Sequence, residues 1–175
     1  MKRKIIVIAV AVLCLAIISS GTIAYFTYED TAKNVITTGN IKIKLEEWTL
    51  KSGKRVPFEN TEAMPGVEIS KIVDVKNVGD NPAFIRVKVD AEDLPVSFDI
   101  NKADWTYSDG YYYYNSVLPA NETTTPLFTT VHFDENMGNE WMNKKIEIAV
   151  TASATQSDNN GSDALHASGW SDIND

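Results

Sequence analysis

The side chains best able to perform catalysis are two histidines among twenty-four acidic residues. A zinc peptidase usually presents two histidines one helical turn apart, with a glutamate that acts as the base. His132 and His166 lie 34 positions apart, and neither belongs to a His-Glu-x-x-His pattern. The sequence also lacks a G-x-S-x-G elbow, a phosphate loop and a dinucleotide fingerprint. We therefore expect no catalytic residues, no metal and no cofactor, with His132 exposed on a strand and His166 solvated.

Two other groups of residues have the chemistry of a binding site. Oxygen-rich loops can hold Ca²⁺, and the C-terminal stretch carries Asp158, Asp163, Asp172 and Asp175 beside Asn159 and Asn160. No EF-hand spacing occurs there, so a solvated tail is favoured. The aromatic run Tyr111–Tyr114, with Trp105 and Tyr107 just before it, is typical of cross-strand packing, although an exposed face could bind a sugar or a protein.

Net charge and cysteine content exclude several classes of function. The chain has 175 residues and a formal net charge of −8. A strongly acidic surface argues against nucleic-acid binding, which needs a basic patch. The single cysteine, Cys14, lies in the apolar N-terminal run, so the remainder forms no disulfide and must be stabilised by core burial and sheet hydrogen bonds.

The N-terminus has the order of a secretory signal. Three cations (Lys2, Arg3 and Lys4) precede the apolar run Ile5–Ile18, and small residues follow up to Ala24. We predict a signal helix over residues 1–24 that is cleaved after Ala24, or alternatively after Tyr25, with membrane contact only before cleavage. Its loss removes three cations and takes the net charge from −8 to −11. The alternative is a retained membrane anchor.

Period-2 alternation beyond the signal predicts an all-β domain. The expected strands are 41–48, 67–76, 83–90, 105–107, 111–114, 127–133 and 146–155, with a polar loop over 50–63. Turn residues 77–82 predict a hairpin between the second and third of these strands, and Ser108-Asp109-Gly110 predicts another. Lys71 interrupts the apolar side of its strand, which suggests a sheet edge.

Short strands separated by turns indicate one antiparallel β-sandwich, predicted over residues 25–156, followed by a polar tail over 157–175. Alternation alone does not separate a jelly roll from an immunoglobulin-like topology. The tail is expected either to fold back as a short helical turn or to stay loose.

A series of short motifs resembles the TasA/camelysin family, whose members are exported by Gram-positive bacteria. The motifs, in order, are Gly21–Thr27, Thr38–Ile43, Met64–Gly66, Lys76–Asp80, Gly110–Tyr114, Leu118–Thr125 and Ala152–Gln156. The resemblance implies a jelly roll, a signal peptide processed by a signal peptidase of the SipW type, and a role in extracellular matrix or biofilm fibres. Camelysin-type members have also been classed as metallopeptidases, which the histidine spacing does not favour.

The segment that would follow cleavage suggests how such a protein assembles. Tyr25, Phe26, Thr27 and Tyr28 have high β-propensity and could pair with the sheet edge of a neighbouring subunit. We expect a non-enzymatic structural protein of the cell surface or matrix that associates with itself or with related subunits. The alternatives are a secreted metallopeptidase that uses His132, a ligand-binding module centred on Trp105 and Tyr111–Tyr114, and a soluble monomer that covers its own edge.

Overall fold

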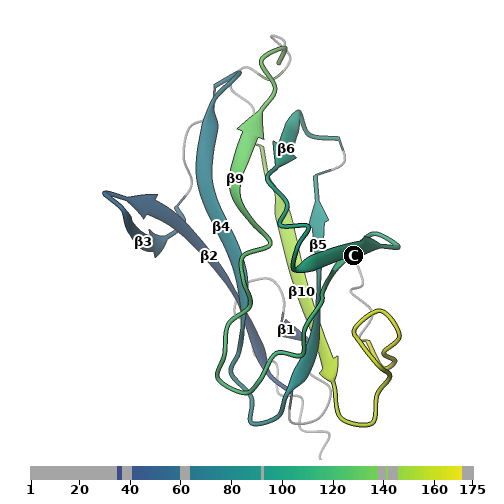
Figure 1. The fold of residues 1–175 in the computed structure, drawn as a ribbon. Helices are drawn as coiled ribbons and strands as arrows, with labels where there is room; N and C mark the ends of the chain where they lie inside the picture. Colours follow the sequence, from purple (N-terminus) through teal and green to yellow (C-terminus); the bar gives the residue numbers. More distant parts are fainter. Residues whose placement is uncertain are drawn as a thin grey trace, which may run out of the picture. The chain divides into compact units, whose positions relative to one another are not determined.

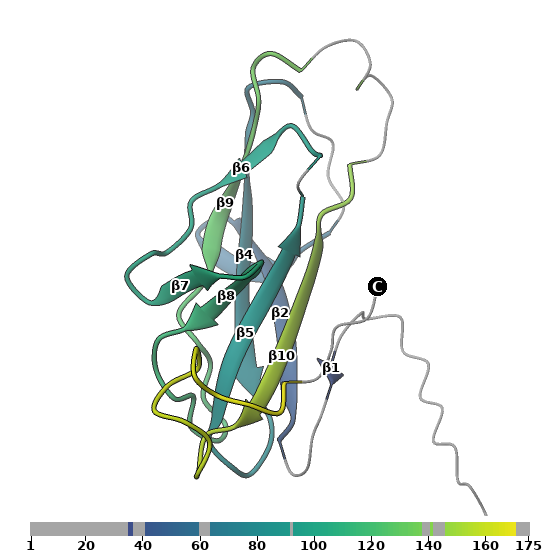
Figure 2. The same cartoon turned by 90° about the vertical axis from the view of Figure 1, so that its right-hand side faces the viewer.

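The described part of the chain folds as ten strands in two five-stranded sheets (Figures 1 and 2). The computed structural model describes residues 41–59, 64–91, 93–137, 141 and 146–170, and the backbone of residues 35–36. Sheet A has the order β1 (Val35–Ile36), β10 (Ala149–Gln156), β5 (Ala83–Asp90), β8 (Tyr111–Tyr114) and β7 (Trp105–Ser108). Sheet B has the order β3 (Lys54–Pro57), β2 (Ile43–Lys51), β4 (Glu68–Asn77), β9 (Phe128–Phe133) and β6 (Val96–Phe98).

Neighbouring strands are antiparallel throughout both sheets, apart from the parallel pair β1–β10. The inward side chains of the two sheets form a single core that includes Ile43, Val75, Ile85, Val87 and Phe128, each at most 1 % exposed. The predicted all-β sandwich is therefore confirmed, since every regular element longer than one turn in the described ranges is a strand. The jelly-roll topology stays a prediction.

The hairpin β7–β8 forms where Asp-Gly predicts it. Asp109 and Gly110 both have positive φ, 48° and 82°, which is the backbone that a two-residue type I′ turn requires. The register places Trp105 opposite Tyr114 and Tyr107 opposite Tyr112. Because successive side chains of a strand point to opposite sides, these four aromatic residues share one face of the hairpin.

The hairpin predicted from residues 67–76 and 83–90 is wrong. These residues form β4 and β5, which lie in different sheets, so residues 78–82 cross from sheet B to sheet A. Asn77 holds this crossing: its amide donates to Asn81 O at 2.8 Å and to Leu118 O at 3.2 Å, and its oxygen accepts from Gly79 N at 3.0 Å. Alternation assigns residues to a face of a strand but does not identify the partner strand.

Two further expectations in sheet B are corrected. The predicted polar loop 50–63 contains β3, which pairs with β2 across the turn Ser52-Gly53, where φ is 54° and 76°. Lys71 lies on the central strand β4 and is 5 % exposed, not at a sheet edge. Its ammonium lies 2.7 Å from Glu47 Oε1 and 4.1 Å above the Phe58 ring, so a polar partner and an aromatic face compensate its burial.

Residues 157–170, which we call the C-terminal strap, fold back across the outer face of sheet A (Figure 2, yellow). Asn160 closes the strap: its side chain donates to Gln156 O and Ser168 O and accepts from Ser168 N, all within 2.9 Å. Ala164 is buried, and Trp170 contacts Tyr113 edge-on at 5.8 Å between ring centroids. The strap therefore has a defined packing, including a turn at residues 164–166.

Candidate functional site

The one histidine on a described strand, His132, lies in a polar row across sheet B. The register places Glu68 of β4 opposite His132 of β9, and His132 opposite Ser97 of β6. His132 Nδ1 lies 3.0 Å from Glu68 Oε1. Both side chains remain open to solvent, at 39 % and 69 % exposure, in keeping with the predicted exposure of His132. A pair this exposed contributes little to stability or to binding by itself.

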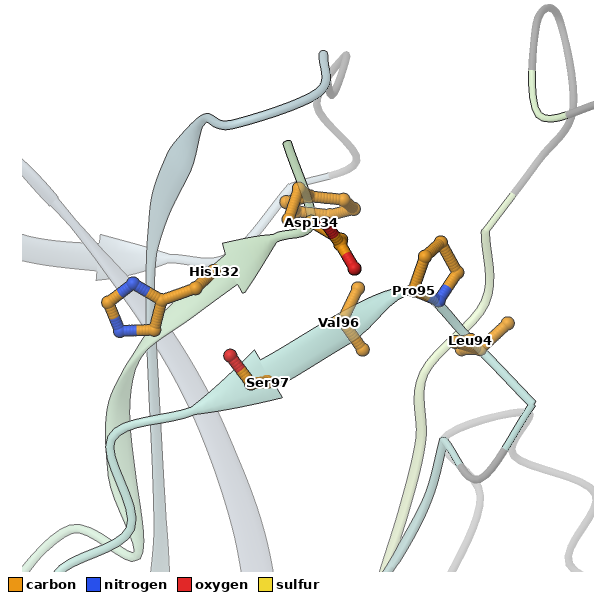
Figure 3. Close-up of a pocket in the computed structure, with 7 residues that line it drawn as sticks. Leu94, Pro95, Val96, Ser97, His132 and Asp134 are labelled. Atoms are coloured by element: carbon orange, nitrogen blue, oxygen red, sulfur yellow. The ribbon is translucent and has the colours of Figure 1, made fainter. Parts of the chain in front are cut away.

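A shallow hollow adjoins this row (Figure 3). Its volume is about 250 Å³, and its lining residues are Leu94, Pro95, Val96, Ser97, His132, Phe133 and Asp134. The imidazole of His132 points toward the β4 side, away from Pro95 and Asp134 (Figure 3). Asp134 accepts hydrogen bonds from the backbone and side-chain nitrogens of Asn136 at 2.8 and 3.0 Å. The imidazole of His132 and the carboxylate of Asp134 thus point in different directions (Figure 3).

The donor set around His132 does not fit a catalytic zinc ion. Catalytic zinc sites use three protein ligands and leave a fourth position for water or substrate. His132 and Glu68 supply two, and no group of three His, Cys, Asp or Glu side chains suited to a metal occurs within the described ranges. We therefore derive no metal-dependent step at this site, and the expectation of a non-catalytic protein stays a prediction.

His166 lies in the C-terminal strap and serves a local purpose. Its Nδ1 is 2.8 Å from Asp163 Oδ1, and its backbone N–H donates to the same carboxylate at 3.1 Å. Hydrogen bonds from Ser162 and then from His166 hold the pKa of Asp163 below its ordinary value. Asn160 is fully used in closing the strap, and Asp172 and Asp175 lie outside the described residues. Among the described members of this oxygen-rich group, Asp163 and Asn160 are therefore engaged in contacts within the strap.

The aromatic run Tyr111–Tyr114 divides between the two faces of sheet A, as cross-strand packing predicts. Tyr114 stacks on buried Trp105 at 5.0 Å between centroids, and Tyr112 stacks on Tyr107 at 4.9 Å. Tyr111 and Tyr113 point to the opposite face, where the C-terminal strap lies. Burial raises the pKa of the Tyr112 phenol, and the neighbouring Tyr107 raises it further.

A second hollow, of about 480 Å³, lies beside the β7–β8 hairpin. It is lined by Ile100, Lys102, Trp105, Thr106, Tyr107 and Tyr112. Tyr107 is 63 % exposed, which is unusual for a large aromatic side chain, whereas Trp105 beside it is 2 % exposed. Ile100 and Lys102 lie in the loop that follows β6, so the hollow opens between the β7–β8 hairpin of sheet A and a loop leading from sheet B.

Two buried charged residues escaped prediction from the sequence. Arg86 on β5 is 8 % exposed and Asp74 on β4 is 1 % exposed. Both lie on the side of their strands that carries the polar residues of the alternating pattern. Sequence alternation predicts that residues on this polar side are exposed to solvent. It carries no signal that the strap covers Arg86 or that β3 brings Arg55 to within 2.9 Å of Asp74.

The edge of sheet A next to the N-terminus bears on the assembly hypothesis. Val35 and Ile36 of β1 pair in parallel with Ala152 and Ser153 of β10. Ala24, Tyr25 and the proposed pairing strand Tyr25–Tyr28 lie outside the described residues, so cleavage and strand donation stay predictions. The described ranges also contain no helix with the length and hydropathy of a membrane span.

A family model supports the resemblance seen in the sequence. The model described as camelysin metallo-endopeptidase matches residues 1–81, which include β1 to β4 and the segment that leads into them. No curated protein and no solved structure matches the chain. The family match supports an extracellular family member. It covers 81 of the 175 residues and supports the resemblance of this chain to the TasA/camelysin family.

Proposed function

We propose that this protein is an exported structural subunit of the cell surface or extracellular matrix, released by a signal peptidase of the SipW type. In this proposal subunits associate when the N-terminal segment Tyr25–Tyr28 of one pairs with a sheet edge of the next. The observation that carries the proposal is the short pairing of β1. Within the described residues it covers Ala152 and Ser153, whereas β10 runs over eight residues, Ala149–Gln156. The family match supports the extracellular part.

The register of β1 also supports pairing of the aromatic segment with another molecule. Val35 stands opposite Ala152 in a parallel pair. If that register were continued toward the N-terminus, position 28 would face position 145 and position 25 would face position 142. Both fall before the start of β10 at Ala149. We therefore propose that a second copy, and not the same molecule, provides the sheet edge that pairs with Tyr25–Tyr28.

The test follows fibre formation by light scattering and electron microscopy over days. Residues 25–175 are compared with residues 34–175 and with a 25–175 variant that carries Phe26→Ser and Tyr28→Ser. We expect fibres from the first protein alone. A synthetic peptide of residues 25–34, added in excess, should shorten or prevent them because it occupies the accepting edge. Fibres from all three proteins, or from none at high concentration, would show that this segment does not drive assembly.

The family description favours a second candidate, an endopeptidase. The His132–Glu68 pair and the adjoining hollow are where we would look for it, although their donor set is one ligand short of a zinc site. Cleavage of a protein substrate that is lost on treatment with a chelator and also lost in His132→Ala would establish this activity. Cleavage that persists in His132→Ala would place it elsewhere or in a contaminant.

A further inference from the structure

We propose that the hollow beside the β7–β8 hairpin binds an anionic sugar unit, such as a uronic acid residue of an acidic polysaccharide. In this arrangement the sugar ring lies against Tyr107 and Tyr112, and its carboxylate pairs with Lys102. The inference is independent of strand donation, because it concerns the opposite edge strand of sheet A from β1.

The first support is an aromatic ladder that continues out of the core. Trp105 and Tyr114 form its inner step, with Trp105 buried, and Tyr107 and Tyr112 form the outer step. The two outer rings lie 4.9 Å apart at 51°, and Tyr107 remains 63 % exposed. Apolar ring faces with hydroxyl groups at their tips suit a sugar, which has apolar C–H faces and polar edges. A side chain with only two χ angles also loses little entropy on binding.

The second support is the rigidity of this platform. The Asp109-Gly110 turn fixes the hairpin register, and Trp105 Nε1 donates to Thr125 O at 3.2 Å. Asn115 N donates to Asp104 O at 2.8 Å just beyond the hairpin. The backbone that carries the exposed rings is therefore held in place before any ligand arrives, which lowers the entropy cost of binding.

The third support is charge. The chain has a net charge of −8, yet the lining of this hollow contains one cation, Lys102, and no acidic residue. The nearest acid in sequence, Asp104, is held by Thr125 Oγ1 at 2.8 Å and Asn101 Nδ2 at 3.0 Å. An exposed lysine within an otherwise acidic molecule attracts an anion locally while the remaining surface repels it. The volume of about 480 Å³ is within the range of small-molecule sites.

The test measures binding to the full-length chain in a mild detergent by calorimetry. The probes are an oligogalacturonate, a neutral galactose oligomer of the same length, and a peptide of residues 25–34. We expect the oligogalacturonate to bind most tightly. Tyr107→Ala should weaken it about tenfold because a stacking partner is lost, whereas Tyr107→Phe should retain it. Lys102→Gln should remove the preference for the acidic over the neutral oligomer.

Lys54→Gln, which removes an exposed lysine of β3, is the matched control and should leave binding unchanged. Thermal unfolding of each variant checks that the hairpin is intact. Three results would overturn the proposal: equal binding of both oligomers with no effect of Lys102→Gln, binding of the peptide in place of either sugar, and no binding of any probe. The second result would assign the hollow to protein docking.

Discussion

The outer faces of the two sheets each bury one charged residue, and the two are accommodated differently. On sheet A, Arg86 donates from Nε to Ser153 Oγ at 2.9 Å and lies between the rings of Tyr111 and Trp170, 4.1 and 4.8 Å from its guanidinium carbon. On sheet B, Arg55 donates to Oδ2 of Asp74 at 2.9 Å, while the buried Oδ1 has no hydrogen-bond partner.

Glu46 lies directly opposite Asp74 in the register of β2 and β4, which adds a like charge to the site on sheet B. Burial raises the pKa of Asp74, and Glu46 raises it further, although Arg55 and the side chain of Trp48 lower it in part. A guanidinium is weakly hydrated and stacks on aromatic faces, so the strap can cover it at little cost. A carboxylate needs more hydrogen bonds than β3 supplies. We therefore expect buried Arg86 to stabilise the packing of the strap. We expect buried Asp74 to destabilise sheet B.

The largest effect is expected from Arg86→Ala. The substitution removes the stacked cation beneath Trp170, the hydrogen bond to Ser153 and the packing of the alkyl stem, and should cost about 3 kcal/mol of unfolding free energy. Urea unfolding measures it. Arg86→Met, which retains much of the stem without the charge, should lose clearly less. A negligible loss in Arg86→Met would mean that the alkyl stem, and not the charge, holds the strap.

Arg55→Ala should come next. Although Arg55 is half exposed, its removal leaves a buried carboxylate without its cation, and we expect a loss of about 2 kcal/mol at neutral pH. In an Asp74→Asn background the same substitution should cost much less, because no charge then needs compensation. Equal costs in the two backgrounds, measured by urea unfolding, would show that the ion pair is not what stabilises β3 against β4.

These two sites also show what the sequence could and could not predict. Seven of the ten described strands and the Asp109-Gly110 hairpin are set by local patterning and turn chemistry and were predicted, whereas the short strands β1, β3 and β6 were not. The placement of β4 and β5 in different sheets depends on contacts of Asn77 with residues as distant as Leu118, which no local pattern encodes.

Because local patterns do not encode contacts between distant residues, the sequence also failed to predict the buried charges and the hollow. Arg86 and Asp74 alternate as surface residues do, whereas Lys71 interrupts the apolar side of its strand. All three are buried by segments distant in sequence: Trp170 over Arg86, Arg55 beside Asp74, and Glu47 with Phe58 around Lys71. The aromatic run was recognised as either packing or binding, but only the structure separates the buried step of the ladder from the exposed step.

Gly161→Ala should disturb the strap alone, with a smaller effect. Gly161 has a φ of 82°, and an added Cβ would lie 2.8 Å from the backbone oxygen of His166, so the strap must shift. We expect a loss of about 1 to 2 kcal/mol and faster proteolysis near the C-terminus. Gly53→Ala, also at positive φ but with open space around it, is the control for backbone strain alone. A similar loss in both variants would mean that the packing of the strap adds nothing.

Asp74→Asn should give the smallest effect and the opposite sign. The folded state raises the pKa of Asp74 above its ordinary value of 3.8, so the folded protein disfavours the carboxylate relative to the neutral acid. Asn resembles the neutral acid at every pH, and we expect a gain of up to about 1 kcal/mol at neutral pH. The stability that wild type owes to protonated Asp74 is complete below the ordinary pKa and is lost as pH rises through the raised one.

The gap between Asp74→Asn and wild type should therefore be smallest in acid and should widen toward neutral pH, as followed by urea unfolding at a series of pH values. Asp80→Asn, which removes an exposed acid from the loop between β4 and β5, controls for the change in net charge and should show no such trend. A gap that narrows as pH rises would mean that the carboxylate stabilises the folded state through Arg55. Sheet B would then accommodate its buried charge as well as sheet A does, and the contrast between the two faces would disappear.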